Sequence, residues 1–305
     1  MIKSRISINP TPPFSFKNTI YSHGWAALRP NVYDKESNKF TRIELLDSRK
    51  VVKLTLTGTD DYQKPIVNIY IESETELLAS EKKEIKDKVR YMLRIDEDLT
   101  PFYKLCNKKG GEWKELTKGL GRLLRGTSLF EDIVKIICTT NVQWSGTKGM
   151  ADRLCEFYGE PLPSDKSLRA FPTPEKIARS NLKMFDKKVR MGYRSEYVHL
   201  LARQIIKGDL DLNKFFDKST PTPDLKKDLL KIKGIGSYAS ALLLMMLERY
   251  DEIAVDTVFR EFMKQKYYPE LYPSDKESMK IYDEWKKWKF LAYWFDLWQF
   301  HRENV

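Results

Sequence analysis

Two features in the last third of the chain have residue types and a spacing suited to chemistry. Gly234-Ile235-Gly236 lies between two apolar helical patterns, and a lone carboxylate, Asp256, follows twenty residues after the second glycine. Unpaired N–H groups at a helix start bind anions, and a fixed carboxylate stabilises developing positive charge or accepts a proton. Each feature also has a structural explanation: a tight turn between packed helices for the glycines, and a helix N-cap for the aspartate.

The glycine pair predicts a phosphate-binding hairpin over residues 225–247. One helix ends within LLKIKG and the next begins at SYASALLL, so the first N–H groups of the second helix lie beside two residues without a side chain. The predicted phosphate contacts come from Lys233, Gly234, Gly236, Ser237 and Ala239, with Lys227 and Lys231 as further charges. Such contacts would hold a nucleic-acid backbone without reading its bases.

The elements that position these residues follow from hydrophobic periodicity. Between Arg42 and Glu72 apolar residues alternate with period two on either side of a turn at Gly58, which predicts antiparallel strands. From Ser80, the expected cap of the first long helix, apolar residues recur at helical spacing almost to the C-terminus. The sequence therefore predicts an α+β protein, with an antiparallel sheet domain in residues 1–100 and a helical region in residues 101–305.

A second candidate segment lies between two predicted helices in the middle of the chain. Ser128 and Glu131 form a capping box at the start of the first helix, which is expected to end near Asn141. The next helix is expected over roughly Thr147–Tyr158, with Phe157 facing inward. The sequence between them, NVQWSG, is predicted to be a polar and aromatic loop that is held at both ends.

Composition limits the partners. The chain has 54 Lys and Arg against 43 Asp and Glu, a net charge of +11, which favours nucleic acid first and an anionic membrane second. The longest apolar stretch, Tyr238 to Leu247, is too short to span a bilayer, and the N-terminus lacks the apolar core of a signal peptide. We therefore expect a cytoplasmic protein, associated with the nucleoid in a prokaryote. Three cysteines and three histidines without ligand spacing predict no iron–sulfur or other structural metal cluster.

Taken together, these features resemble the helix-hairpin-helix (HhH-GPD) DNA glycosylases. In that superfamily a hairpin of the form Leu-x-x-(apolar)-x-Gly-(apolar)-Gly precedes an essential aspartate, as Leu229–Gly236 precede Val255-Asp256 here. RLLRGTSLFEDIVKIICTTN, GMADRLCEFYG and GYRSEYV are similar to segments of 8-oxoguanine DNA glycosylases, and PPFSFKNTIYSHGWAAL is similar to the sheet domain that those enzymes share with bacterial 3-methyladenine DNA glycosylases. The resemblance covers most of the chain and implies a cleft between two helical subdomains.

The resemblance implies a role for each candidate residue. Asp256 would stabilise an oxocarbenium-like sugar, or orient or deprotonate a water, after a damaged nucleotide is flipped out of double-stranded DNA. Asn141 stands where the family fills the vacated space, with Gln143 and Trp144 as wedge or pocket residues; a helix C-cap and a buried tryptophan are the structural alternatives. A monovalent cation, Na⁺ or K⁺, is implied on the backbone carbonyls of Leu230, Ile232 and Ile235, and no other cofactor is required.

Tyr238 departs from the pattern of the strand-cleaving members of the superfamily. Those enzymes have a lysine at this position, whose amine forms a Schiff base with the sugar. A tyrosine instead resembles the aromatic residue of bacterial 3-methyladenine DNA glycosylases, and its ring can stack on a cationic base; a ring packed under the hairpin is the structural alternative.

The sequence therefore predicts a monomeric, monofunctional DNA N-glycosylase of base excision repair. An alkylated purine is the favoured substrate, and an oxidised purine is the second choice. Two alternatives stay open: a non-catalytic protein that binds damaged DNA, and a bifunctional glycosylase/AP lyase that uses a displaced lysine such as Lys233. The aromatic run from Trp285 to the end is expected to pack in the core, with no part in the chemistry.

Overall fold

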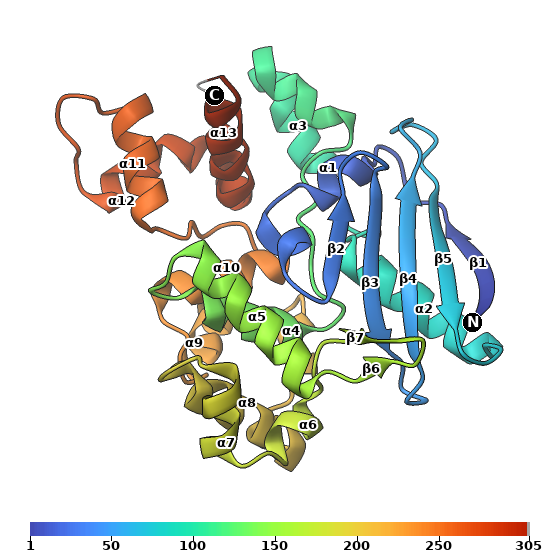
Figure 1. Cartoon of the computed structure of the whole chain (residues 1–305). Coiled ribbons are helices and arrows are strands. Elements are labelled where there is room, and N and C mark those ends of the chain that lie inside the picture. The colour runs from blue at the N-terminus through green and yellow to red at the C-terminus, as the bar shows by residue number, and fades with distance from the viewer. Residues whose placement is uncertain (304–305) are drawn as a thin grey trace. The chain divides into compact units, whose positions relative to one another are not determined.

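The computed structural model, which describes residues 1–303, begins with an antiparallel sheet of five strands (Figure 1). The alternating apolar residues of two central strands pair across the sheet, Leu54 with Ile71 and Leu56 with Ile69, and all four are buried. The strands are β1 (Ile2–Ile8), β2 (Asn31–Asp34), β3 (Lys39–Leu45), β4 (Val51–Gly58) and β5 (Val67–Ser73), in the spatial order β1-β5-β4-β3-β2. The predicted strands are confirmed, and β1 and β2 extend the sheet at its two edges.

A long helix, α2 (Ala79–Met92), packs on the sheet through Ile85, Val89 and Met92, which are fully buried. Its predicted N-cap is wrong. The cap residue is Leu78, and the carboxylate of Glu81 accepts its N–H group at 2.8 Å, so Ser80 already lies inside the helix. The carboxylate therefore provides at this helix end the acceptor that was expected from a serine hydroxyl.

The chain forms two compact units, Met1–Leu210 and Asp211–Val305. The boundary that the sequence predicts at residue 100 lies inside the first unit, which joins the sheet to the first helices, and residues 304–305 of the predicted helical region lie outside the described residues. The other helices of the first unit are α1 (Phe16–Ile20), α3 (Thr100–Lys109), α4 (Leu129–Thr139), α5 (Trp144–Tyr158), α6 (Pro174–Ala178), α7 (Leu182–Val189) and α8 (Arg194–Lys207), with 3₁₀ helices at Gly24–Ala27 and Gly111–Lys118.

Two details of this helical part differ from the prediction. Helix α5 begins at Trp144, three residues earlier than expected, and the side chain of Phe157 near its end is 40% exposed instead of facing inward. A polar hairpin of two short strands, β6 (Pro161–Leu162) and β7 (Asp165–Arg169), follows α5. The prediction missed it because its residues show no apolar alternation.

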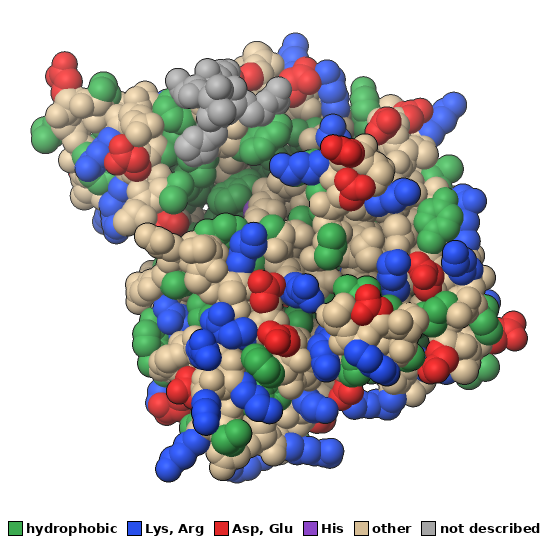
Figure 2. Space-filling view, viewed as in Figure 1, with side chains coloured by type: hydrophobic (Ala, Val, Ile, Leu, Met, Phe, Trp, Pro, Cys, Tyr) green, Lys and Arg blue, Asp and Glu red, His purple; other side chains and the backbone are tan. Residues whose placement is uncertain are grey.

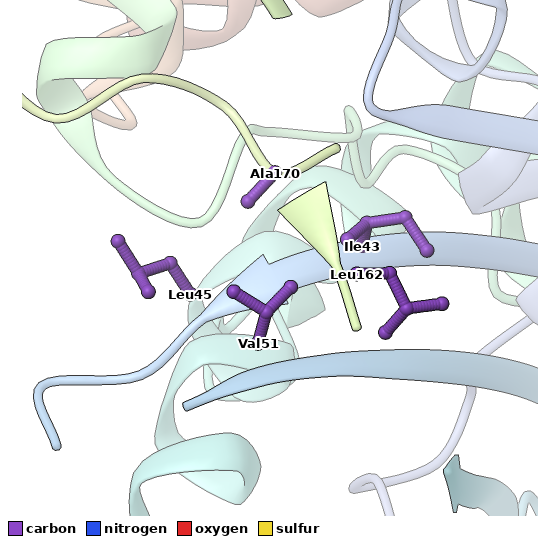
Figure 3. Close-up of a cluster of buried hydrophobic side chains, with 5 residues drawn as sticks. All are labelled: Ile43, Leu45, Val51, Leu162 and Ala170. Carbon is purple, nitrogen blue, oxygen red and sulfur yellow. The ribbon is translucent and has the colours of Figure 1, made fainter. Parts of the chain in front are cut away.

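The β6–β7 hairpin is attached to the main sheet by a small apolar cluster. Leu162 and Ala170 pack against Ile43, Leu45 and Val51 of β3 and β4 (Figure 3). Burial of these five side chains joins the sheet to the segment that follows α5. The hairpin has too few residues to be stable alone, so this packing stabilises it.

A buried ion cluster joins the sheet to α4. Arg42 of β3 contacts Glu44 and Glu131, each at 2.6 Å, and Lys135 contacts Glu131 at 2.6 Å. Burial raises the pKa of Glu131, but the charges of Arg42 and Lys135 outweigh this and lower it to about 2. The predicted capping box is therefore only half formed: the Ser128 hydroxyl accepts the Glu131 N–H, while the Glu131 carboxylate binds Arg42.

The second unit is helical. Its elements are η3 (Leu212–Phe216), α9 (Thr222–Leu230), α10 (Ser237–Met246), α11 (Thr257–Lys266), α12 (Asp275–Ser278), η4 (Met279–Trp288) and α13 (Lys289–Glu303). The core packing predicted for the aromatic end of the chain is confirmed at Phe290, Leu291 and Phe295, which are buried. No helix in the described part of the chain has both the length and the apolar surface to cross a membrane.

Candidate active site

The glycine pair lies in a tight hairpin between α9 and α10. Helix α9 ends at Leu230, and the Ile235 N–H then donates to the Ile232 carbonyl at 3.0 Å. Gly234 has a φ of 93°, a value that side-chain-bearing residues rarely adopt. Gly236 is the N-cap residue of α10. The turn therefore requires a glycine at 234 for its backbone conformation.

The start of α10 is open to solvent. Gly236 has no side chain to cap the first N–H groups of this ten-residue helix, and a Cβ atom built on it would meet no atom within 4 Å. Ser237 and Lys233 are exposed, while Ala239 is buried. Lys227 and Lys231 form surface ion pairs with Asp224 and Asp228, at 2.9 Å and 2.6 Å. Exposed pairs of this kind are weak, so both lysines can turn to an anionic partner.

One of the three carbonyls that are expected to hold a cation already accepts a backbone hydrogen bond. The Ile232 carbonyl already accepts the Ile235 N–H, and a carbonyl oxygen has a second lone pair for a cation.

Among residues 1–303, no three His, Cys, Asp or Glu side chains are grouped so that they could hold a metal ion. Cys106, Cys138 and Cys155 are buried, and this burial raises the pKa of each thiol to about 12.

Asp256 is the N-cap residue of α11 and is partly exposed. Its Oδ1 accepts the Phe259 N–H at 2.8 Å, so the structural explanation of this residue is confirmed. The nearest cationic side chain on the same helix, Arg260, is held by Asp275 at 2.9 Å, and no ion pair within residues 1–303 involves Asp256. The carboxylate is thus stabilised by the helix start, and the charge of Arg260 acts on it from the same helix without a direct ion pair.

Tyr238, in the first turn of α10, is partly buried, and the Asp256 carboxylate acts electrostatically on its hydroxyl group. Burial, then the charge of Asp256 and hydrogen bonding to it, raise the pKa of Tyr238. The phenol is therefore protonated at neutral pH.

Tyr293 of α13 completes this group, and the sequence did not indicate it. Its side chain is 3% exposed and packs against the rings of Phe259 and Phe262, with centroids at 5.2 Å and 6.1 Å. Burial, then the charges of Asp256 and Tyr238, raise the pKa of Tyr293 well above its ordinary value. Tyr293 lies 37 residues after Asp256, and no local pattern connects them.

The second group of predicted residues lies in the first unit, between α4 and α5. Asn141 has a φ of 48°, the left-handed conformation that ends many helices, as its structural alternative predicts. Asn141 and Gln143 are exposed, and Trp144 is 42% exposed, so the alternative of a buried tryptophan is wrong. The indole packs beside Gly24, where a Cβ atom would lie 2.4 Å from it. The segment presents polar and aromatic side chains to solvent.

Arg194 holds this loop in place, and the sequence did not indicate that role. Its side chain is buried, and its guanidinium donates to the carbonyls of Thr140 and Asn141 and to that of Met191. The Tyr193 ring covers the guanidinium at 4.5 Å and is itself half exposed. The GYRSEYV segment thus places one side chain under the loop and one beside it.

Exposed basic residues lie over the helices of the first unit. Helix α7 and its C-cap present Lys183, Lys187, Lys188 and Arg190 to solvent, and Figure 2 shows Lys and Arg side chains over this part of the viewed face. Positive surface of this kind attracts polyanions with an affinity that falls as the salt concentration rises.

The chain has relatives among known proteins. The family model described as HhH-GPD superfamily base excision DNA repair protein matches residues 134–287, about half of the chain. A DNA-3-methyladenine glycosylase of Bacillus subtilis (strain 168) is 24% identical over 285 residues, which cover 88% of each chain.

Two solved structures share the fold. The 3-methyladenine DNA-glycosylase from Archaeoglobus fulgidus superposes with a TM-score of 0.72 at 18% identity, over 96% of this chain and 98% of that chain. The 8-oxoguanine glycosylase/lyase of Clostridium acetobutylicum, in complex with double-stranded DNA containing cytosine opposite 8-oxoguanine, gives 0.69 at 18% identity, over 99% of both chains.

Proposed function

Because this chain belongs to the HhH-GPD superfamily of base excision DNA repair proteins, we propose that it is a monofunctional DNA N-glycosylase. Its substrate is a damaged base in double-stranded DNA, an alkylated purine before an oxidised one, and the name of the Bacillus subtilis relative supports this order. The observation that carries the proposal is the Asp256 carboxylate, which is fixed at a helix start by the Phe259 N–H and is partly exposed.

The two groups of residues would act on different parts of the DNA. The N–H groups at the start of α10, with Lys233, would bind a phosphate beside the lesion, since no side chain covers them. The exposed side chains of Asn141, Gln143 and Trp144 would fill the space that the flipped nucleotide leaves. A single protomer has all of these groups, so we propose that the protein acts as a monomer, in the compartment that contains the DNA.

The chemistry would depend on the charge of Asp256. As the bond between base and sugar breaks, the sugar gains positive charge, and a fixed carboxylate stabilises it without the reorganisation that water needs. The same carboxylate could instead orient or deprotonate the attacking water. Both routes need an ionised side chain, and the hydrogen bond from the Phe259 N–H stabilises the ionised form.

The tyrosine at position 238 argues against strand cleavage by this protein. A Schiff base requires an amine, and the phenol of Tyr238 has none. Tyr238 also stays protonated, since its pKa is raised, so it is a poor nucleophile at neutral pH. We include in the proposal a monovalent cation on the carbonyls of Leu230, Ile232 and Ile235, which would hold the hairpin in the shape that binds phosphate.

The test is a single-turnover assay on duplexes that each contain one modified base, with base release and strand cleavage scored separately. Wild-type protein should release at least one alkylated purine without cleaving the strand. Asp256→Asn should lower the rate constant by about 100-fold or more. Asparagine is as good an N-cap as aspartate, so the variant should keep its fold and its DNA affinity. Replacing K⁺ or Na⁺ by tetramethylammonium should weaken DNA binding if the hairpin holds a cation.

Other outcomes would contradict the proposal. Tight binding to abasic DNA without release of any base would indicate a non-catalytic binding protein. Cleavage of the strand with an adduct trapped by borohydride would indicate a bifunctional enzyme, and Lys233→Gln would then test the displaced lysine.

A further inference from the structure

The positive charge of this protein is concentrated in the segment that forms helices α6 to α8. Residues 174–207, about a ninth of the chain, contain nine Lys and Arg against three Asp and Glu, a net charge of +6 out of +11. The other 271 residues carry only +5. Such an imbalance within one group of helices is typical of a surface that binds a polyanion.

Helix α7 arranges three of these charges in one line. Lys183, Lys187 and Arg190 follow each other at intervals of four and three residues, so they lie on one face of α7 and its C-cap. All three are exposed, while Phe185 and Val189 on the opposite face are fully buried. Within residues 1–303 none of the three basic side chains forms an ion pair. We call this set of three residues the α7 stripe.

Helix stability does not explain the α7 stripe. Lys183 and Lys187 are like charges four residues apart, which repel each other, and Lys183 is in the first turn, where a positive charge opposes the helix dipole. The one acidic residue of the helix, Asp186, accepts a hydrogen bond from the Ser195 hydroxyl at 2.6 Å. The stripe therefore lowers the stability of the helix that carries it, which indicates that it serves a partner.

We propose that the α7 stripe binds the phosphate backbone of duplex DNA beside the lesion, as a contact separate from the hairpin. This inference rests on the proposed function, which supplies the partner, and it adds a contact surface in the first unit. The stripe spans about 10 Å at a rise of about 1.5 Å per residue, and phosphates follow each other at about 3.4 Å along the axis of one strand. Its length is therefore sufficient for three phosphate contacts.

One guanidinium joins the end of the α7 stripe to the loop that is proposed to enter the DNA. Arg194 donates to the Met191 carbonyl, the first one after the stripe, at 3.4 Å, and to the Asn141 carbonyl at 3.3 Å. The Nε atom of Arg153 donates to the Val189 carbonyl at 2.6 Å, which fixes the end of α7 to α5. A duplex whose vacated space is filled by this loop would therefore pass close to the stripe.

Duplex DNA fits the α7 stripe better than an anionic membrane does. A helix that lies on a membrane surface inserts its apolar face among the lipids, and the apolar face of α7, with Phe185 and Val189, is buried inside the first unit. The exposed apolar side chains of α7, Leu182 and Met184, are both in its first turn and are too few to anchor it. The stripe can therefore contact a partner only through its charges.

The test measures the affinity of the whole chain for a labelled duplex at several salt concentrations by fluorescence anisotropy. In the triple variant Lys183→Gln/Lys187→Gln/Arg190→Gln, the slope of log K against log salt concentration should fall in magnitude by about 2 to 3, because each phosphate contact accounts for about 0.9. The loss should be equal for an undamaged duplex and for one that contains an abasic-site analogue, because backbone contacts do not read bases.

The matched control removes three exposed lysines elsewhere in the first unit. Lys86→Gln/Lys104→Gln/Lys108→Gln changes the net charge by the same amount, on α2 and α3. It should keep the wild-type slope within about 0.5, because charges away from the DNA are screened by salt. An equal fall of the slope in both triple variants would show that only net charge matters, and it would overturn the inference.

Other outcomes also decide the question. A wild-type slope in the α7 variant would overturn the inference, and so would a loss confined to the abasic-site duplex, since the stripe would then act at the lesion. Wild-type protein that binds phosphatidylglycerol vesicles through the stripe, with an unchanged slope for DNA in the α7 variant, would assign the stripe to a membrane. Wild-type protein with a slope that depends on the stripe, but without release of any base, would instead contradict the proposed function and leave this inference standing.

Discussion

Gly234 and Gly236 are two residues apart in the hairpin, yet the structure gives them different roles. Gly234 has a φ of 93°, so its lack of a side chain is needed for the backbone conformation. Gly236 has a φ of −97°, which any residue adopts, and the space beside it is empty. The backbone conformation therefore does not require a glycine at 236, and the proposed phosphate contact gives a reason for one.

This difference leads to a prediction for two alanine variants. Gly234→Ala should lower the free energy of unfolding by about 1 kcal/mol, because alanine is strained at a positive φ. Gly236→Ala should change it by less than about 0.5 kcal/mol but weaken DNA binding several-fold, because a methyl group would lie where a phosphate approaches. Urea unfolding and fluorescence anisotropy with a labelled duplex measure the two effects. Equal DNA affinity of Gly236→Ala and wild type would contradict the phosphate-binding role of the hairpin.

At the scale of elements, the loop between α4 and α5 depends on a helix that is far away in the sequence. Asn141 follows the C-cap of α4 in a left-handed conformation, and two consecutive carbonyls, of Thr140 and Asn141, are bound by the Arg194 side chain of α8. A planar guanidinium can donate to both carbonyls at once, which a lysine ammonium does less well. Helix α8 thus determines how the exposed loop side chains are presented.

Arg194→Lys tests this dependence. We expect faster amide hydrogen exchange in residues 141–143 and a drop of about tenfold in base release, because the loop loses one or more hydrogen bonds from a charged donor. The control is Arg203→Lys, since Arg203 is exposed on the same helix. Hydrogen exchange followed by mass spectrometry locates the change. Unaltered exchange in the loop would mean that its conformation does not need the guanidinium.

At the scale of the whole molecule, acid should destabilise the first unit through His23. The His23 imidazole stays neutral in the folded state at mildly acidic pH, because burial, and then the charges of Arg94 and Lys135, lower its pKa to about 3. Its bond to the Leu124 carbonyl, at 2.6 Å, acts in the opposite direction. The unfolded chain takes up a proton at His23 near pH 6.5, and the folded chain does not. Stability is therefore full above pH 6.5 and falls as the pH decreases towards the folded pKa.

The resulting prediction concerns the pH dependence of unfolding. Between pH 7.5 and pH 5, His23 should lower the free energy of unfolding by up to about 2 kcal/mol, since 1.5 pH units below the unfolded pKa correspond to that amount. His23→Gln should flatten this slope, whatever its stability at pH 7.5. Urea unfolding curves at several pH values, for wild type and variant, provide the measurement. Parallel slopes in the two proteins would show that His23 does not titrate as described.

Several features of this protein follow from its sequence alone. The order of sheet and helices, the hairpin at Gly234-Ile235-Gly236 and the packing of the aromatic C-terminal helix all depend on residues within about one helix or strand of each other. Local propensity and hydrophobic period are sufficient at that range. The prediction was wrong at Ser80, which lies inside α2 and does not cap it, and at Phe157, which is exposed. At both positions the local pattern is compatible with either arrangement.

Only the tertiary structure decided which side chains meet. Tyr238 and Tyr293 come under the charge of Asp256 from 18 and 37 positions away, and Arg194 donates to the Asn141 carbonyl from 53 positions away. Each of these approaches depends on how helices pack, and many side chains of the core together set that packing. The sequence therefore indicated which carboxylate could do the chemistry, while helix packing determined which side chains lie near it.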